Sequence, residues 1–144
     1  MISVLACTAT MLAGLIISTP AARADTPMDK AWDRLEKAFN KLRDGLKEPN
    51  DADKEAYQKL GAIIKTETTA AMKFDPKMLK NVPEADRETF LANFRKDMAT
   101  FDGDVDKLNA ALDAGQWAEA QKMVGILGQA KKDGHKLYRQ KEKK

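Results

Sequence analysis

The amino-acid sequence predicts an all-α protein folded as an antiparallel up-down-up-down four-helix bundle. Apolar residues recur at the helical spacing i, i+3, i+4 and i+7 in four separate stretches. No stretch alternates polar and apolar residues at period two, and runs of β-branched residues are absent. Because most links between the four stretches are short, consecutive helices are expected to run antiparallel.

Residues 1–24 indicate an export signal that precedes the folded domain. The stretch 2–17 is largely apolar and uncharged, and Ala22-Arg23-Ala24 has the small-x-small pattern of a signal-peptidase site. We expect cleavage before Asp25, a mature bundle over 25–144 and a periplasmic location. The apolar run is short for a membrane span of about 20 residues, so no span is expected after cleavage. A retained N-terminal anchor is the alternative.

The first predicted helix begins at Pro27, since proline is tolerated in a first turn, and Asp25 or Thr26 is its expected cap. It ends before Glu48-Pro49-Asn50-Asp51. Its apolar face is formed by Met28, Ala31, Trp32, Leu35, Ala38, Phe39, Leu42 and Leu46.

The second predicted helix ends at Asp75-Pro76, and the stretch through Asn81-Val82-Pro83 indicates a loop with one short turn. Its expected apolar side consists of Tyr57, Leu60, Ile63, Ile64, Ala70, Ala71 and Phe74.

The third predicted helix begins near Glu84 and ends at Asp113-Ala114-Gly115, with glycine at the usual stop position. Gly103 interrupts it at a cost of about 1 kcal/mol, which indicates a tight contact or a mild bend. Its apolar face holds Phe90, Phe94, Met98, Phe101, Val105, Leu108 and Leu112. The fourth predicted helix carries Trp117, Ala120, Val124, Leu127, Gly134, His135 and Tyr138.

The composition of the mature chain excludes several kinds of function. Cys7, the one cysteine, lies in the predicted signal, so disulfides, thiolate metal sites and a cysteine nucleophile are excluded. The mature chain keeps 24 of the 25 basic residues against 22 acidic ones, and this near balance does not fit nucleic-acid binding. It has no second histidine for a zinc site, no Ser-His-Asp arrangement and no Gly-rich phosphate loop. An enzyme is therefore not expected.

Two residues far apart in the sequence are expected to meet. Met28 opens the first predicted helix, and His135, the one histidine, lies near the end of the last. In an up-down bundle these two positions share one end, where an imidazole and a thioether could together ligate haem iron. Phe94, Met98 and Phe101 lie on one face of the third helix and could line a pocket there. Ordinary core packing for Met28 and these three residues, and a boundary position for His135, are the alternatives.

The C-terminal segment 131–144 has seven basic residues and two acidic ones. These charges could complement the helix macrodipole. Alternatively, Lys131, Lys136 or Arg139 could pair with haem propionates or attract an acidic redox partner.

Three segments resemble the cytochrome b562 family, whose members are periplasmic four-helix bundles that bind haem b without covalent attachment. Near the mature N-terminus, Met28 is followed at the family's offsets by Ala31, Leu35 and Ala38. In the middle, Phe94-Arg95-Lys96-Asp97-Met98 matches Phe-Arg-x-x-Phe, with methionine as the second large residue. The turn 113–121 is then followed by His135, Tyr138 and Arg139, which match His-x-x-Tyr-Arg.

The resemblance implies that Met28 and His135 are the axial ligands of one non-covalent haem b. The implied function is electron transfer with periplasmic redox partner proteins. Lys131 and Gly134 depart from the family, which has arginine and tyrosine there. They also occupy the two cysteine positions through which the related cytochromes c′ attach haem, so covalent attachment is excluded. A haem-free interaction or stress-response bundle and a peroxidase-like or sensor protein remain open as alternatives.

Overall fold

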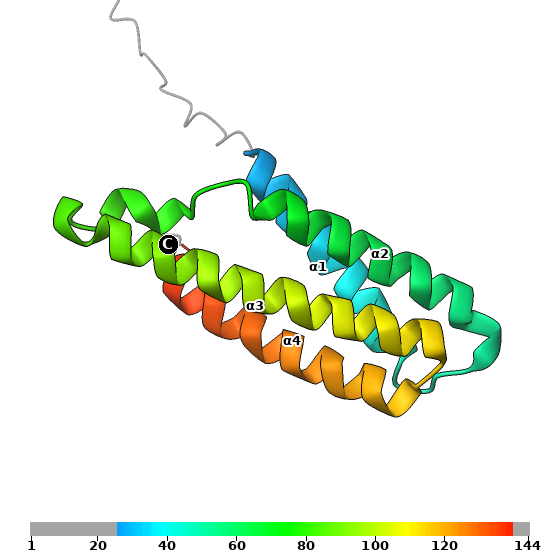
Figure 1. The fold of residues 1–144 in the computed structure, drawn as a ribbon. Coiled ribbons are helices and arrows are strands. Elements are labelled where there is room, and N and C mark those ends of the chain that lie inside the picture. Colours follow the sequence, from blue (N-terminus) through cyan, green and yellow to red (C-terminus); the bar gives the residue numbers. More distant parts are fainter. Residues whose placement is uncertain (1–25, 140–144) are drawn as a thin grey trace, which may run out of the picture.

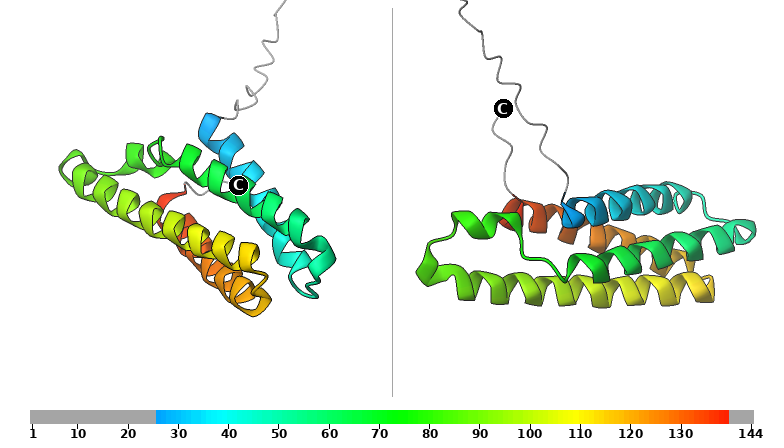
Figure 2. Two further views of the ribbon diagram at one scale, coloured as in Figure 1. Left: turned by 45° about the vertical axis from the view of Figure 1, so that its right-hand side comes forward. Right: turned by 90° about the horizontal axis from the view of Figure 1, so that it is seen from above.

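The computed structural model describes residues 26–139, and within this range all regular structure is helical. Four α-helices, α1 (Pro27–Gly45), α2 (Lys54–Ala71), α3 (Arg87–Ala114) and α4 (Trp117–Tyr138), run alternately up and down (Figures 1 and 2). This arrangement confirms the predicted four-helix bundle. The predicted export signal lies outside the described residues. None of the helices in residues 26–139 combines the length and apolar character that a membrane crossing requires.

The predicted start of the first helix is confirmed, and the structure identifies its cap. The Thr26 hydroxyl accepts a hydrogen bond from the Asp29 backbone N–H at 3.2 Å, while the Asp29 carboxylate accepts one from the Thr26 N–H at 2.9 Å. This reciprocal capping box satisfies two N–H groups that would otherwise lack partners at the helix start. Asp29 and its neighbour Met28 are thereby held in a well-formed first turn.

The link between α2 and α3 differs from the prediction. It contains two short 3₁₀ segments, η2 (Lys77–Asn81) and η3 (Glu84–Asp86), and α3 begins at Arg87 instead of near Glu84. A third 3₁₀ segment, η1 (Asp51–Asp53), leads into α2. Because η2 packs against α3 and α4, this link covers one end of the bundle.

Two residues assigned to the apolar side of α2 are exposed. Ile63 is 43% exposed, and Phe74 lies beyond the helix end and is 36% exposed. The buried side is narrower than predicted because it centres on Ile64, Thr68 and Ala71, which are all 0% exposed. Ile63 is adjacent to Ile64 in the chain and is therefore turned by about a quarter of a helical turn away from the core.

Two predictions were made for glycines of the third helix, namely that Gly115 ends it and that Gly103 interrupts it. Gly115 ends the helix with φ of 68°, and its N–H and that of Gln116 donate to the carbonyls of Leu112 and Ala111 at 3.2 and 2.9 Å, as in a Schellman cap. Gly103 lies inside continuous helix, and a Cβ added there would meet no atom within 4 Å. Of the two alternatives predicted for Gly103, the tight contact is therefore wrong, and the mild bend stays a prediction.

The helices pack unequally. α1 packs mainly against α2, α2 against α3, and α3 against α4, whereas the backbones of α1 and α4 come close at few positions. α1 and α2 are joined by the Arg34 guanidinium, which donates to both oxygens of the buried Glu67 carboxylate at 2.6 and 2.8 Å. The sparse contact between α1 and α4 leaves room for a cavity between them.

The core has two parts. A large cluster around Leu35, Leu42, Leu108 and Leu127 fills most of the bundle. A small cluster at the end where α1 begins consists of Met28, Ala31, Ala71, Phe94 and Met98. Trp32 packs against both clusters and so marks the boundary between them.

Candidate functional site

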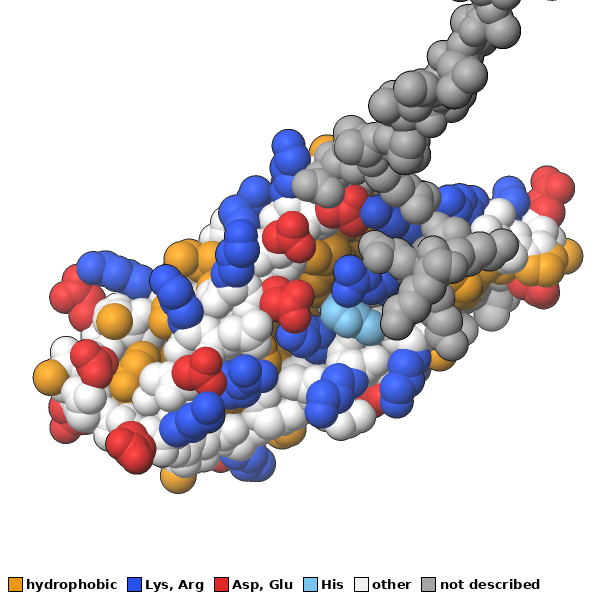
Figure 3. All heavy atoms as spheres, turned by 180° about the vertical axis from the view of Figure 1, so that it is seen from behind, with side chains coloured by type: hydrophobic (Ala, Val, Ile, Leu, Met, Phe, Trp, Pro, Cys, Tyr) orange, Lys and Arg blue, Asp and Glu red, His pale blue; other side chains and the backbone are white. Residues whose placement is uncertain are grey.

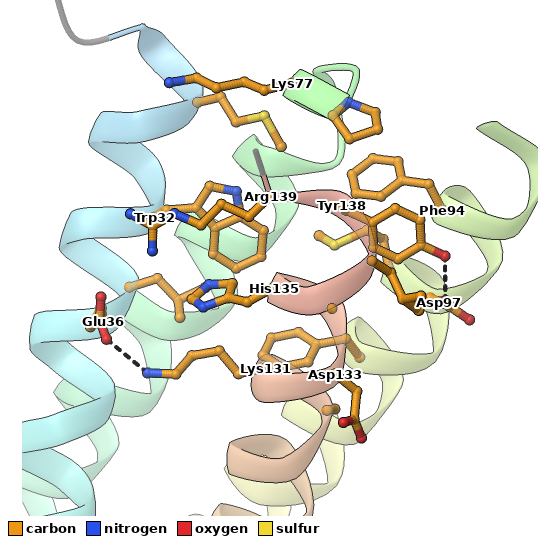
Figure 4. A pocket seen from close by; sticks show the side chains of 18 of the residues that line it. Trp32, Glu36, Lys77, Phe94, Asp97, Lys131, Asp133, His135, Tyr138 and Arg139 are labelled. Atoms are coloured by element: carbon orange, nitrogen blue, oxygen red, sulfur yellow. Dashed lines mark hydrogen bonds and ion pairs between the residues drawn. The ribbon is translucent and has the colours of Figure 1, made fainter. Parts of the chain in front are cut away.

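A cavity of about 860 Å³ opens at the end of the bundle where α1 begins and α4 ends (Figure 4). Its walls come from α1, α3 and α4, and Pro76 and Lys77 of the α2–α3 link complete the lining. The volume lies in the range of roughly 300–1,000 Å³ that is typical of pockets for small molecules and cofactors. Figure 3 shows this face, with the histidine beside apolar side chains and both cationic and anionic side chains around them.

All six residues that were predicted from the sequence to form a binding site line this cavity. Met28 lines it from α1, and His135 and Arg139 line it from α4. The remaining three come from α3 and are Phe94, Met98 and Phe101. The bundle topology therefore places Met28 and His135 on one cavity, although they are more than a hundred residues apart in the chain.

The His135 imidazole is half-buried and faces α1. Its ring meets the Trp32 indole edge-on, with centroids 6.4 Å apart and planes at 80° (Figure 4). Burial lowers the pKa of His135 below 6.5, and the nearby charges of Arg139 and Lys131 lower it further, against the opposing effect of Glu36. Because the ring is consequently neutral at pH 7, its nitrogen lone pair is available to a metal.

An ion pair links α1 and α4 beside this imidazole. Lys131 Nζ of α4 lies 3.0 Å from Glu36 Oε1 of α1 (Figure 4). The same Nζ lies 5.2 Å from the centroid of the Phe39 ring. The Lys131 side chain is only 15% exposed. The hydrogen bond from Lys131 lowers the pKa of Glu36, so the carboxylate is ionised at neutral pH.

A second ion pair joins α1 to the α2–α3 link. Lys77 Nζ lies 2.6 Å from the Asp29 carboxylate, next to Met28 in the chain. Burial by itself would raise the pKa of Asp29, but the hydrogen bonds from Lys77 and Thr26 outweigh it and lower the pKa to about 2. The link is thus fixed to the first turn of α1 at the edge of the cavity.

Tyr138 fixes the end of α4 against α3. Its hydroxyl donates to Asp97 Oδ2 at 2.6 Å, and its ring meets Phe90 and Phe94 edge-on at centroid distances of 5.4 and 5.0 Å. Burial and this hydrogen bond raise the pKa of Tyr138 to about 12. This contact therefore holds against α3 the last turn of α4, which also carries His135.

Sequence reasoning missed several cavity residues. Trp32 and Glu36 follow Met28 by four and eight residues on α1 and line the same cavity. That i+4 and i+8 spacing is a signal that could have found them. Lys77 and Asp29 meet across the α2–α3 link, and no spacing rule predicts such a contact.

The donor set suits a metal held in a macrocycle better than a bare ion. Within residues 26–139, no group of three or more His, Cys, Asp and Glu side chains could hold a metal ion. One imidazole and one thioether on a cavity that has an apolar wall of Phe94, Met98 and Phe101 can instead supply the axial ligands of an iron porphyrin, whose ring provides its own equatorial nitrogens. The residues present therefore fit haem.

These features define a four-helix bundle of the kind that holds a cofactor between facing helices at one end. The chain belongs to the cytochrome b562 family, whose model matches residues 28–139. Proteins of this family bind haem and transfer electrons, and they are not enzymes. The predicted family, fold and absence of an enzymatic activity are thereby confirmed.

Solved structures of cytochromes c′ have the same fold. The cytochrome c′ from Rubrivivax gelatinosus is 23% identical, with a TM-score of 0.64 over 78% of this chain and 91% of that chain. A second cytochrome c′ is 20% identical, with a TM-score of 0.63 over 79% of this chain and 92% of that chain. At these identities the similarity shows the fold alone. No curated protein matches the sequence.

Proposed function

We propose that this protein is a periplasmic electron-transfer protein that binds one haem b without covalent attachment, with Met28 and His135 as axial ligands. The observation that carries the proposal is that these two residues line one cavity, with the histidine held neutral by its surroundings. Bound haem would supply an iron that alternates between the ferric and ferrous states.

The other cavity residues have distinct roles in this proposal. Phe94, Met98 and Phe101 are buried on α3 and provide the apolar wall against which the flat ring packs. Arg139 lies exposed at the end of α4, where its charge can pair with a haem carboxylate. Trp32 orients the imidazole by its edge-on contact.

Non-covalent attachment follows from the residues just before the histidine. A Cys-x-x-Cys-His attachment site would need cysteine at positions 131 and 134, where this chain has Lys131 and Gly134. The haem in this proposal is therefore held by its two axial bonds and by packing. The periplasmic location rests on the export signal predicted at residues 1–24, and the partners are redox proteins of that compartment.

Reconstitution with haem tests this function. The mature protein should bind one haem per chain and give a sharp low-spin spectrum on reduction. Met28→Ala and His135→Ala should each abolish that spectrum, because each removes one axial ligand. Met72→Ala, at an exposed methionine outside the cavity, is the matched control and should leave the spectrum unchanged.

Circular dichroism of the same variants would verify that they remain helical. Absence of a Soret shift when the wild-type protein meets micromolar haem would contradict the proposal. That result would favour a haem-free interaction bundle.

A further inference from the structure

We propose that the Glu36–Lys131 ion pair keeps either of its two partly buried charges from shifting the reduction potential of the haem, because the charges have opposite sign and offset each other. The inference rests on the proposed function, since it concerns the same cavity. Glu36 and Lys131 contribute to the walls of the cavity that Met28 and His135 line. Lys131 precedes His135 by one helical turn, so its charge lies near any iron bound there.

The burial of Lys131 sets this pair apart. Among the ion pairs within residues 26–139, Lys131 is the least exposed cation at 15%, whereas the next, Lys65, is 31% exposed. Its ammonium lies over the Phe39 ring and 3.0 Å from Glu36, whose side chain is 47% exposed. Charges that are partly removed from water are screened less by solvent and salt than fully exposed charges, so they act more strongly on a neighbouring metal.

The two members of the pair act on the iron in opposite directions. Oxidation adds one positive charge at the iron, so the Glu36 carboxylate stabilises the ferric state and lowers the potential. The Lys131 ammonium stabilises the ferrous state and raises the potential. While the pair is intact, the two effects on the potential largely cancel, because the pair places no net charge beside the haem.

The pair also joins two helices whose backbones approach each other at few positions. α1 carries Glu36 and α4 carries Lys131, and other contacts between them are the Trp32–His135 ring pair and the hydrogen bond from Gln121 to the Leu46 carbonyl at the end of α1. A purely structural role would therefore be the competing explanation for any effect of mutation. The sign of the change in reduction potential separates the two explanations. Loosening the cavity would shift the potential of both single variants in the same direction, whereas loss of opposite charges would shift it in opposite directions.

The test is a redox titration of the haem-loaded full-length mature protein, monitored by absorbance. Glu36→Gln should raise the potential and Lys131→Gln should lower it. The shift from Glu36→Gln should be the larger, because it leaves the less exposed charge unpaired. The double variant Glu36→Gln/Lys131→Gln and the conservative variant Lys131→Arg should both stay close to the wild type, since each keeps the pair's net charge at zero.

The matched control is the Glu119–Lys122 pair near the other end of α4, where the side chains are 45% and 65% exposed. Glu119→Gln and Lys122→Gln should leave the potential unchanged. A second readout uses the haem-free protein: the loss of unfolding midpoint in the double variant should be smaller than the sum of the two single losses.

Shifts of the same sign in both single variants, or no shift in either, would overturn the inference while leaving the proposed function intact. If a single variant fails to fold, the double variant and Lys131→Arg still decide the question, because a potential far from the wild type in both would overturn it. Failure of the wild-type protein to bind haem would contradict the proposed function itself, and the first spectrum would show it.

Discussion

At the scale of single residues, the cavity end depends on side chains that connect one helix to another. Tyr138 is an example, because it belongs to α4 but its hydroxyl and ring contact α3 through Asp97, Phe90 and Phe94. A hydrogen bond to a carboxylate is worth about 1.5–3 kcal/mol, and the aromatic contacts add to it. The orientation of the last turn of α4 therefore depends largely on this one residue.

The pH dependence of the stability of Tyr138→Phe, compared with that of the wild type, tests this role of Tyr138. Folding raises the pKa of Tyr138 from 10 to about 12, so the folded state favours the protonated phenol. The associated stability is fully present below pH 10 and is lost as the pH rises from 10 to 12. Its size is about 1–2 kcal/mol after allowance for partial exposure to solvent.

Urea unfolding followed by circular dichroism between pH 8 and pH 12 would measure this loss. Wild-type protein should lose more stability than Tyr138→Phe over that range, because both titrate the same lysines but only the wild type titrates Tyr138. Parallel pH profiles would show that the hydrogen bond to Asp97 contributes nothing.

The sequence predicts those site residues whose position depends only on helical spacing and on the order of the helices in the bundle. Met28 and His135 have apolar-face spacing on the first and last helices, so topology was enough to bring them to one cavity. Lys77 reaches Asp29 from a 3₁₀ segment, and its position depends on a loop path that has no periodicity. Contacts of that kind become visible only in the folded structure.

At the scale of whole helices, α2 and α3 approach each other closely at Gly61. A Cβ added to Gly61 would overlap the Asn109 side-chain oxygen and come within 2.9 Å of Leu112 Cδ1. Because Leu112 is fully buried, it has little room to move aside. The missing side chain at Gly61 therefore sets the distance between these two helices.

Gly61→Ala should destabilise the protein by about 1–3 kcal/mol, the usual cost of overpacking. Gly125→Ala is the matched control, since a Cβ there would meet no atom within 4 Å on the exposed side of α4. It should stabilise the protein by up to about 1 kcal/mol, because alanine favours helix over glycine. Thermal unfolding of both variants measures the difference, and equal effects of the two substitutions would refute the close approach.

Helix spans were predictable within a few residues, but the width of each buried face was not. Ile63 has the spacing of a core residue and is exposed because α2 has neighbours on one narrow side. Gly103 and Gly61 look alike in the sequence, yet only Gly61 meets a neighbouring helix. A helical period indicates which face of a helix is apolar, whereas the neighbouring helices in the bundle decide how much of that face is buried.

At the scale of the whole molecule, the four helix pairs around the bundle differ in how many backbone positions come close, and the α1–α4 pair has the fewest. This pair is joined near the cavity by the contacts around Lys131 and Trp32, and at the other end by the hydrogen bond from Gln121 to the Leu46 carbonyl. Regions with few contacts open at low free energy. The first turns of α1 and the last turns of α4 are therefore expected to be the least stable part of residues 26–139.

Hydrogen exchange measured by mass spectrometry checks this expectation. In haem-free protein, amides of 28–35 and 131–138 should exchange faster than those at the opposite ends of the same helices, 38–45 and 120–127. Haem should slow exchange in the first pair of segments most, because it binds only where both are in place. Equal slowing in all four segments would contradict a local effect.

The placement of the cavity between the first and last helices has a consequence for biosynthesis. With the proposed ligation, a chain that is cut short before His135, or whose last helix has not yet docked, would carry Met28 but offer iron no second axial ligand. Haem with both axial ligands would then form only on a finished polypeptide whose first and last helices have come together. In such a protein the colour of bound haem would report that synthesis and folding are both complete.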